Sequence, residues 1–260
     1  MGLGVTYKKA GLVLGVVLWL GAPASADDWD QASDTDNGNG TDNVLLHGTE
    51  QTHDLAALPG PVLDEDWFLV PVHPFSSYQF VVDGQTGDLA LSSGDVMRVT
   101  ADGAALDSGF LVDGVRSLTW MKAQGPSEEQ FVRVRGAACG TACDERDRYR
   151  ARFYDTTYTV PRFNNSATQT TLVIIQNASK RTCDMTLFFL DSLGQLVLAR
   201  NVPTLAPESL RIVGSSEATS PSGSVRIAHT CGYGGLAGKA VSIEPATGFT
   251  FDTPVLPRPR

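Results

Sequence analysis

Leu63-Asp64-Glu65-Asp66-Trp67-Phe68-Leu69-Val70-Pro71-Val72 is a strand-like stretch with three carboxylates at its start. In an extended chain, Trp67, Leu69 and Pro71 lie on one side and Phe68, Val70 and Val72 on the other. Both sides are apolar, so we expect a strand that is buried between two layers. The carboxylates at its mouth must stay hydrated, meet cations or bind a metal.

Similar strand-like stretches recur through the rest of the chain, separated by turn residues such as Asp83-Gly84. After the N-terminus, no segment has the 3.6-residue periodicity of an amphipathic helix. The pattern predicts an all-β protein built from two antiparallel β-sandwiches. The expected strands are 44–47, 66–72, 78–83, 96–100, 110–112, 118–122, 131–135 and 149–154, then 170–176, 183–191, 195–201, 209–213, 224–229, 239–244 and 249–253.

The 260-residue chain has room for two ordinary domains. We expect a signal peptide at 1–26, because Lys8-Lys9 precedes an apolar run that ends in Ala24-Ser25-Ala26; a retained anchor is the alternative. Residues 27–42 have no core-forming pattern and are expected to be an acidic, flexible leader. The two sandwiches then occupy 43–160 and 161–253, with a boundary near Pro161. A proline-rich tail, 254–260, should run extended over the surface.

The expected signal peptide predicts a secreted protein, periplasmic or extracellular. Signal cleavage removes two lysines and no acidic residue, which leaves 18 basic against 29 acidic residues, or −11. This balance argues against nucleic acid as a partner, and no later apolar run reaches transmembrane length. Four cysteines in a secreted chain predict disulfides Cys139–Cys143 and Cys183–Cys231, one in each domain. Other pairings would link the two domains, and the spacing does not suit a zinc site.

The segment from Thr41 to about Val160 resembles a bacterial pre-peptidase C-terminal (PPC) domain. The motifs that carry the resemblance are Thr41-Asp42-Asn43, Asp64-Glu65-Asp66-Trp67-Phe68, Ser77-Tyr78-Gln79-Phe80, Phe131-Val132-Arg133-Val134 and Tyr149-Arg150-Ala151-Arg152. The resemblance implies a jelly-roll-like, non-catalytic sandwich attached to secreted enzymes or surface proteins. The second half is similar to uncharacterised β-sandwich repeats of secreted bacterial proteins, and its size suits an immunoglobulin-like sandwich.

The acidic residues form a candidate calcium site. Calcium takes about six to eight oxygen ligands, and Asp64 and Asp66, two residues apart on a strand, point to the same side. The PPC resemblance, through calcium-binding relatives in bacterial collagenases, implies this role for Asp42, Asp64 and Asp66. The competing interpretation is a solvated acidic loop without metal. The leader can supply the remaining ligands from Asp34, Asp36 and Asp42, with Asn37 or Asn39.

Five arginines form a second candidate site. Arg133 and Arg135 share one face of an expected strand, and Arg148, Arg150 and Arg152 share one face of another. If these two strands pair with each other, the arginines make a basic stripe for an anionic ligand. The interpretation we favour is a solvated outer face, neutralised by Glu128, Glu129, Asp144, Glu145 and Asp147.

No catalytic motif is recognisable. Gly-x-Ser-x-Gly and His-Glu-x-x-His are absent, and the four histidines, at 47, 53, 73 and 229, are scattered along the chain. We therefore expect a non-catalytic secreted binding or adhesion module that acts on an extracellular polysaccharide, a protein or a surface partner. A secreted hydrolase with an unrecognised site is the alternative, since folding can assemble a triad from distant residues. A structural component of the cell envelope is the third possibility.

Overall fold

The structure is a computed structural model that describes residues 36–56, 64–87, 89–112, 114–136, 139, 142–166 and 168–259. Within these ranges the regular elements are β-strands, and the sheets are antiparallel throughout. The all-β prediction is therefore confirmed. The described ranges contain no helix that could cross a membrane. The expected signal peptide lies outside them.

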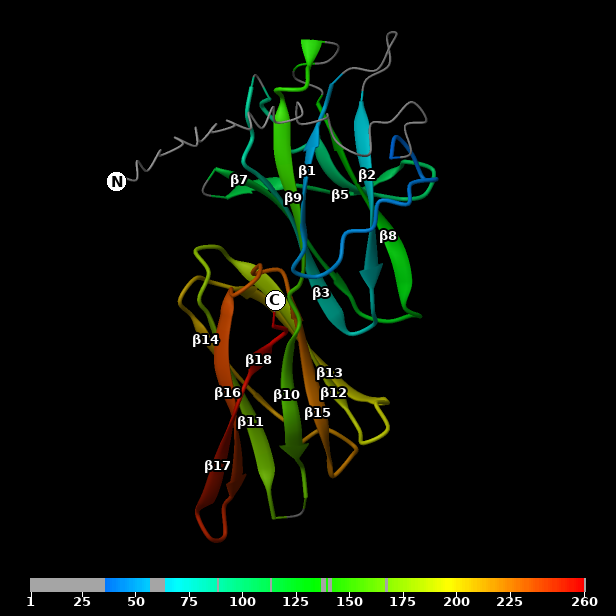
Figure 1. Cartoon of the computed structure of the whole chain (residues 1–260). Helices are drawn as coiled ribbons and strands as arrows, with labels where there is room; N and C mark the ends of the chain where they lie inside the picture. Colours follow the sequence, from blue (N-terminus) through cyan, green and yellow to red (C-terminus); the bar gives the residue numbers. More distant parts are fainter. Residues whose placement is uncertain are drawn as a thin grey trace, which may run out of the picture.

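The first sandwich, at the top of Figure 1, consists of two packed sheets. One sheet has the order β1-β9-β3-β7-β6 and the other the order β2-β8-β4-β5. The strands are β1 (Glu50–Asp54), β2 (Glu65–Val72), β3 (Ser76–Asp83), β4 (Val96–Val99), β5 (Ala105–Ser108), β6 (Phe110–Val112), β7 (Val115–Lys122), β8 (Glu128–Arg135) and β9 (Arg148–Asp155).

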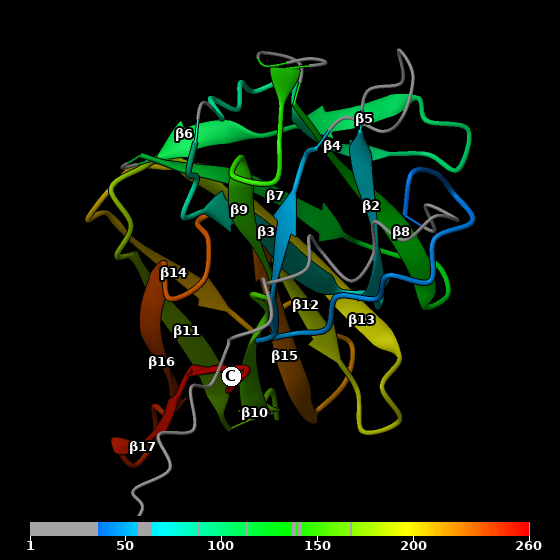
Figure 2. The same ribbon diagram turned by 45° about the horizontal axis from the view of Figure 1, so that its top comes forward.

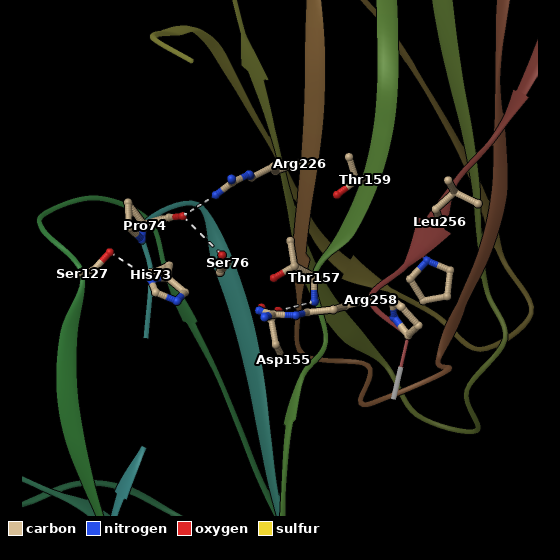
Figure 3. A pocket seen from close by; sticks show the side chains of 12 residues that line it. His73, Pro74, Ser76, Ser127, Asp155, Thr157, Thr159, Arg226, Leu256 and Arg258 are labelled. Atoms are coloured by element: carbon tan, nitrogen blue, oxygen red, sulfur yellow. Dashed lines mark hydrogen bonds and ion pairs between the residues drawn. The ribbon is translucent and has the colours of Figure 1, made fainter. Parts of the chain in front are cut away.

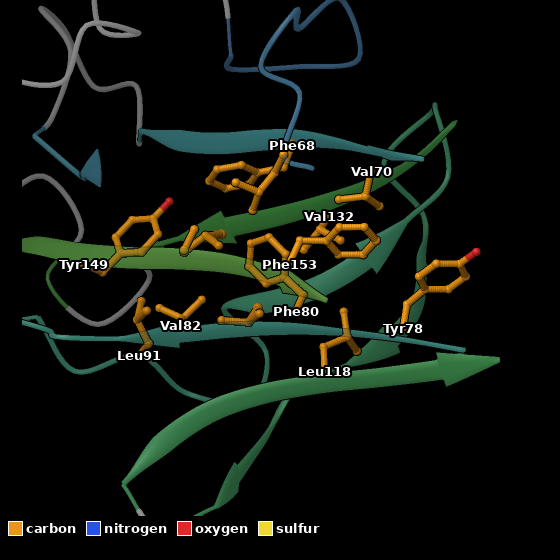
Figure 4. Close-up of a cluster of buried hydrophobic side chains, with 14 of the residues drawn as sticks. Phe68, Val70, Tyr78, Phe80, Val82, Leu91, Leu118, Val132, Tyr149 and Phe153 are labelled. Carbon is orange, nitrogen blue, oxygen red and sulfur yellow. The ribbon is translucent and has the colours of Figure 1, made fainter. Parts of the chain in front are cut away.

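Strand β2 is fully buried on one face only, because Leu69 and Pro71 on the other face are half-buried. The expectation of a strand buried on both sides is therefore confirmed only in part. Phe68 and Val70 point between the two sheets, where Figure 4 shows them near Phe80 and Phe153. On the opposite face Trp67 packs edge-on against Phe131, with ring centroids 5.7 Å apart. The aromatic core between the sheets thus fixes which side chains of β2 point inward.

The second sandwich, below the first in Figure 1, has sheets of order β13-β12-β15-β10-β18 and β14-β11-β16-β17. Its core contains Phe163, Ile175, Leu187, Phe189 and Ile227, all fully buried. The strands are β10 (Tyr158–Asn164), β11 (Thr170–Asn177), β12 (Cys183–Leu190), β13 (Leu196–Leu205), β14 (Leu210–Gly214), β15 (Ser222–His229), β16 (Leu236–Glu244), β17 (Phe249–Pro254) and β18 (Leu256–Pro257).

Each sandwich contains one of the predicted disulfides. Cys139 and Cys143 are joined, with Cα atoms 5.2 Å apart, in the connection between β8 and β9. Cys183, at the start of β12, is joined to Cys231, just after β15, with Cα atoms 5.0 Å apart. Both pairings match the prediction.

The two sandwiches contact each other through the outer faces of β3 and β7 on one side and of β12 and β15 on the other (Figures 1 and 2). Gln79 on β3 accepts a hydrogen bond of 2.7 Å from the Tyr233 backbone N–H. The rings of Phe75 and Phe188 lie 5.1 Å apart. Phe188 is consequently buried although it points away from the core of its own sandwich.

The structure moves three of the expected domain limits. Residues 36–42, expected as flexible leader, run along the edge of β2, where the Trp67 N–H donates to the Asp36 carbonyl oxygen at 2.8 Å. Pro161 lies inside β10, so the chain crosses between sandwiches near Thr156 and Thr157. The expected tail is extended and largely exposed, as predicted, but Leu256–Pro257 also form strand β18 beside β10, so the second sandwich extends into it.

The strand predicted at residues 44–47 is not formed as a regular strand. Val44 and His47 make only isolated bridges, to Leu69 and Phe153, and the regular strand, β1, begins at Glu50. The segment 36–45 instead follows the open edge of β2 through backbone hydrogen bonds, including Leu69 N–H to the Asn43 carbonyl oxygen at 2.8 Å. Covering this edge prevents the strand from pairing with another chain.

Candidate functional site

A buried acidic pocket lies at one end of the first sandwich. Asp66 on β2 is in line with Phe68 and Val70, so its carboxylate points between the sheets. The segment 36–45 brings Asp36 to the same place, and β1 contributes His53. Asp36 and Asp66 are fully buried, and His53 is 1% exposed.

Ligand-type atoms of these three residues all lie within 4.8 Å of one another. His53 Nδ1 is 3.5 Å from Asp66 Oδ1 and 3.8 Å from Asp36 Oδ2. The Tyr149 hydroxyl donates to Asp66 Oδ2. The His53 ring stacks on Tyr149, its cross-strand neighbour, at 5.8 Å. We call the group Asp36, His53, Asp64 and Asp66 the acidic pocket.

The hydrogen bonds of His53 limit what the acidic pocket can hold. His53 Nε2 lies 3.1 Å from the Gln51 side-chain oxygen, which accepts and therefore calls for the proton on Nε2. In the neutral tautomer the Nδ1 lone pair then faces two carboxylates, which is unfavourable in a buried site. Either a second proton on the imidazole or a cation between Nδ1 and the carboxylates removes this repulsion.

The donor set of the pocket suits calcium in most respects. Asp64, which precedes β2 and stands two residues before Asp66, is 3% exposed, so three buried carboxylates could supply oxygen ligands. Asn43 is fully buried on the same edge of β2, and its side-chain amide has no hydrogen-bond partner within the described ranges. His53 is the exception, because calcium prefers oxygen to nitrogen.

The structure brings together only part of the predicted ligand set. Asp36 and Asp66 meet, and Asp64 is buried two residues before Asp66. Asp42 is exposed, and Asp34 lies outside the described residues. His53 was missed, because its closeness to Asp66 arises from sheet packing and not from sequence spacing.

The five arginines do not form a single stripe. Arg133 and Arg135 lie on β8, which pairs with β2 and β4. Arg148, Arg150 and Arg152 lie on β9, in the other sheet, where it pairs with β1 and β3. The predicted pairing of these two strands is wrong, because a chain that passes from one sheet of a sandwich to the other does not make a hairpin.

Acidic side chains pair with four of these arginines, but they are different residues from those predicted, and Arg148 instead donates to a backbone carbonyl. Arg150 Nε donates to Asp83 Oδ1 at 2.8 Å, and Arg152 pairs with the same carboxylate. Further contacts are Arg133 Nη1 to Glu65 Oε2 at 3.4 Å, Arg135 Nε to Asp95 Oδ1 at 3.9 Å and Arg148 Nε to the Glu145 carbonyl oxygen at 2.8 Å.

A polar cleft of about 560 Å³ lies where the two sandwiches meet (Figure 3). The first sandwich contributes His73, Pro74, Ser76, Ser127 and Asp155, and the second contributes Thr157, Thr159, Arg226 and the chain from Leu256 to Pro259. We call this the junction cleft. Nothing local in the sequence marks it, because its residues come from five separate segments.

Hydrogen bonds hold the walls of the junction cleft in place. Arg258 Nη1 pairs with Asp155 Oδ2 at 2.7 Å, which ties the C-terminal segment to the end of β9. His47 Nε2 lies 2.8 Å from the Pro259 carbonyl oxygen. On the other wall, His73 Nδ1 lies 2.8 Å from Ser127 Oγ.

No family model and no curated protein sequence matches the chain. Among solved structures, it is similar to the full extracellular region of zebrafish Gpr126/Adgrg6, at 10% identity and a TM-score of 0.22, over 83% of this chain and 33% of that one. It is also similar to a β-glucuronidase from glycoside hydrolase family 2, at 12% identity and a TM-score of 0.18, over 85% of this chain and 25% of that one. The chain spans about a third and a quarter of these proteins, and such scores do not bear on its function.

Proposed function

We propose that this chain is a secreted, non-catalytic binding module for an extracellular polysaccharide or a surface protein. The observation that carries the proposal is the junction cleft, whose volume of about 560 Å³ falls in the usual range for ligand sites. Hydrogen-bonding side chains converge there from both sandwiches. The two disulfides suit an oxidising compartment.

The binding function is tested with immobilised polysaccharides and matrix proteins. Thr159 lies exposed in the cleft wall on β10, so Thr159→Trp should block the cleft and weaken retention of the ligand at least about tenfold. Thr250→Trp, at an exposed position on β17, serves as the control. If Thr159→Trp does not change the retention of the ligand, the ligand binds outside the junction cleft. Hydrolysis of a panel member that one point mutation abolishes would favour the hydrolase alternative.

We further propose that the first sandwich is a PPC-type domain whose acidic pocket binds calcium through Asp36, Asp64 and Asp66. Ligand-type atoms of Asp36, His53 and Asp66 lie within 4.8 Å of one another, and Asp64 is buried two residues before Asp66, so the oxygen ligands that calcium prefers gather at one end of the sandwich. Asp36 belongs to the segment 36–45, so a bound ion would clamp this segment onto β2. The ion would hold the segment 36–45 against β2 by electrostatic attraction and would take part in no chemical step.

Calcium is therefore expected to raise the thermal stability of the protein. For dissociation constants typical of extracellular modules, about 5 mM calcium adds roughly 1–2 kcal/mol to the free energy of unfolding. Asp66→Asn should abolish this shift, whereas Asp102→Asn, at an exposed turn, should retain it. Melting curves recorded in calcium and in chelator make the comparison. A wild-type melting temperature that calcium does not move would contradict calcium binding at this site.

A further inference from the structure

Leu256, Thr159 and Arg226, which line the junction cleft, belong to a row of cross-strand neighbours on the outer face of one sheet. Leu256 on β18 lies opposite Thr159 on β10, Thr159 lies opposite Arg226 on β15, and Arg226 lies opposite Phe188 on β12. Neighbours in register point to the same face. Arg226 therefore lies between the exposed hydroxyl of Thr159 and the buried ring of Phe188, which contacts the first sandwich.

Arg226 is a partly buried cation that lines the cleft. Its Nη1 donates to the Pro74 carbonyl oxygen at 3.2 Å across the junction (Figure 3). Within the described ranges no carboxylate lies within ion-pairing distance of it. Arg258, the other cleft arginine, is already neutralised by Asp155. A guanidinium that has lost part of its water and has no counter-ion favours an anionic ligand.

The rest of the cleft suits a sugar. Hydroxyl groups of Ser76, Ser127 and Thr159 line it, beside the apolar surfaces of Leu256 and Pro257. Hydroxyls can exchange hydrogen bonds with a sugar, and apolar side chains can cover the C–H faces of its ring. The chain as a whole carries −9, so long-range repulsion disfavours densely charged polymers such as nucleic acid.

We propose that the junction cleft binds an anionic sugar unit, with its acidic group on Arg226 and its hydroxyls on the polar side chains around it. This inference rests on the proposed binding function and specifies its ligand. The forked guanidinium matches the two oxygens of a carboxylate and equally those of a sulfate ester, so a uronic acid and a sulfated sugar share the required chemistry. The sparse charge of such a unit also fits a cleft in which, among the described residues, Arg258 pairs with Asp155 and Arg226 has no carboxylate partner.

Titration calorimetry with three short oligosaccharides of equal length, one neutral, one containing uronic acid and one sulfated, tests the proposal. We expect the neutral oligosaccharide to bind at least about tenfold more weakly than one of the acidic ones. Arg226→Gln should remove this preference, and Arg226→Lys should keep only part of it, because a lysine cannot make the two-pronged contact. Thr159→Val should weaken binding by a smaller factor without touching the contact to Pro74. Arg211→Gln, at an exposed arginine on β14, is the matched control and should bind as the wild type does.

Three results would overturn the proposal, the third together with the proposed function. Equal affinity for neutral and acidic oligosaccharides, unchanged in Arg226→Gln, would refute the anionic ligand and leave the general binding function standing. Failure of every oligosaccharide to bind, with proteins retained in the panel, would exclude sugars from the cleft. If neither sugars nor proteins are retained, the proposed function itself fails. Melting temperatures of the variants, compared with that of the wild type, establish that each one is folded.

Discussion

His229 is a fully buried residue at the junction of the two sandwiches, and its hydrogen bonds fix its charge state. Nε2 lies 2.8 Å from the Thr156 carbonyl oxygen, so it donates. Nδ1 accepts a hydrogen bond from the Cys231 backbone N–H at 3.1 Å. In the neutral imidazole, both ring nitrogens therefore make hydrogen bonds, one as donor and one as acceptor. Burial lowers the pKa of His229 to about 4, although the Thr156 carbonyl and Asp155 act in the opposite direction.

This lowered pKa predicts acid sensitivity. In the unfolded chain a histidine has a pKa of about 6.5. Between pH 6.5 and 4, His229 is therefore protonated in the unfolded state but stays neutral in the folded state. The stability that depends on neutral His229 is therefore fully present above about pH 6.5 and is lost as the pH falls toward 4, by about 3 kcal/mol in total. Denaturant unfolding of wild type and His229→Gln at several pH values measures this. The variant should lose less stability on acidification, and equal losses would contradict the assignment.

Residues near a strong local pattern could be predicted from the sequence, and residues brought in by packing could not. Asp64 and Asp66 stand beside an apolar strand, which marks them at once, and both are buried. His53 joins Asp66 through β1 and β9, and Arg226 reaches the cleft only because two sandwiches meet there. No spacing in the sequence records those contacts. The pairing of the cysteines was predictable because each pair lies within one sandwich.

At the level of the strand, β10 shows why the sequence misplaced the domain boundary. A proline usually argues against the interior of a strand because it has no N–H to donate. Here the register between β10 and β15 shifts between Val160 and Phe163, so Pro161 falls in an irregular stretch of the ladder. The strand continues past the proline, and the change of sandwich comes earlier, before Tyr158.

The same stretch of β15 contains a glycine that the packing requires. A Cβ on Gly223 would overlap the Leu190 carbonyl oxygen and come within 2.9 Å of the Phe163 ring. Gly223→Ala should therefore cost about 2–3 kcal/mol in the free energy of unfolding, the usual range for overpacking. Gly214→Ala, where the nearest atom belongs to Leu172 at 3.6 Å, is the matched control and should change stability by less than about 0.5 kcal/mol. Equal effects of the two substitutions in denaturant unfolding would show that β15 adjusts to the added methyl group.

At the level of the whole molecule, the contact between the sandwiches is continuous and partly apolar. Phe75, Met121 and Leu196 pack on the buried side chains of Phe188 and Ala228. Hydrogen bonds flank this apolar cluster, from Tyr233 to Gln79 and from His229 to Thr156. Domains joined by a small polar contact move independently, whereas an apolar contact of this kind favours a fixed arrangement. The junction cleft depends on that arrangement, because its two walls belong to different sandwiches.

The two sandwiches are therefore expected to unfold as one cooperative unit. Phe188 contributes little to the core of its own sandwich, so Phe188→Ala should mainly weaken the junction, where its ring lies 5.1 Å from that of Phe75. Differential scanning calorimetry should show one transition for the wild type and two, or one clearly broadened, for the variant, with a loss of about 3 kcal/mol or more of stability. Phe249→Ala, at a ring 58% exposed on β17, should leave the single transition unchanged. Two separate transitions in the wild type would show that the sandwiches are not coupled, and the affinity of the cleft would then include the cost of bringing its walls together.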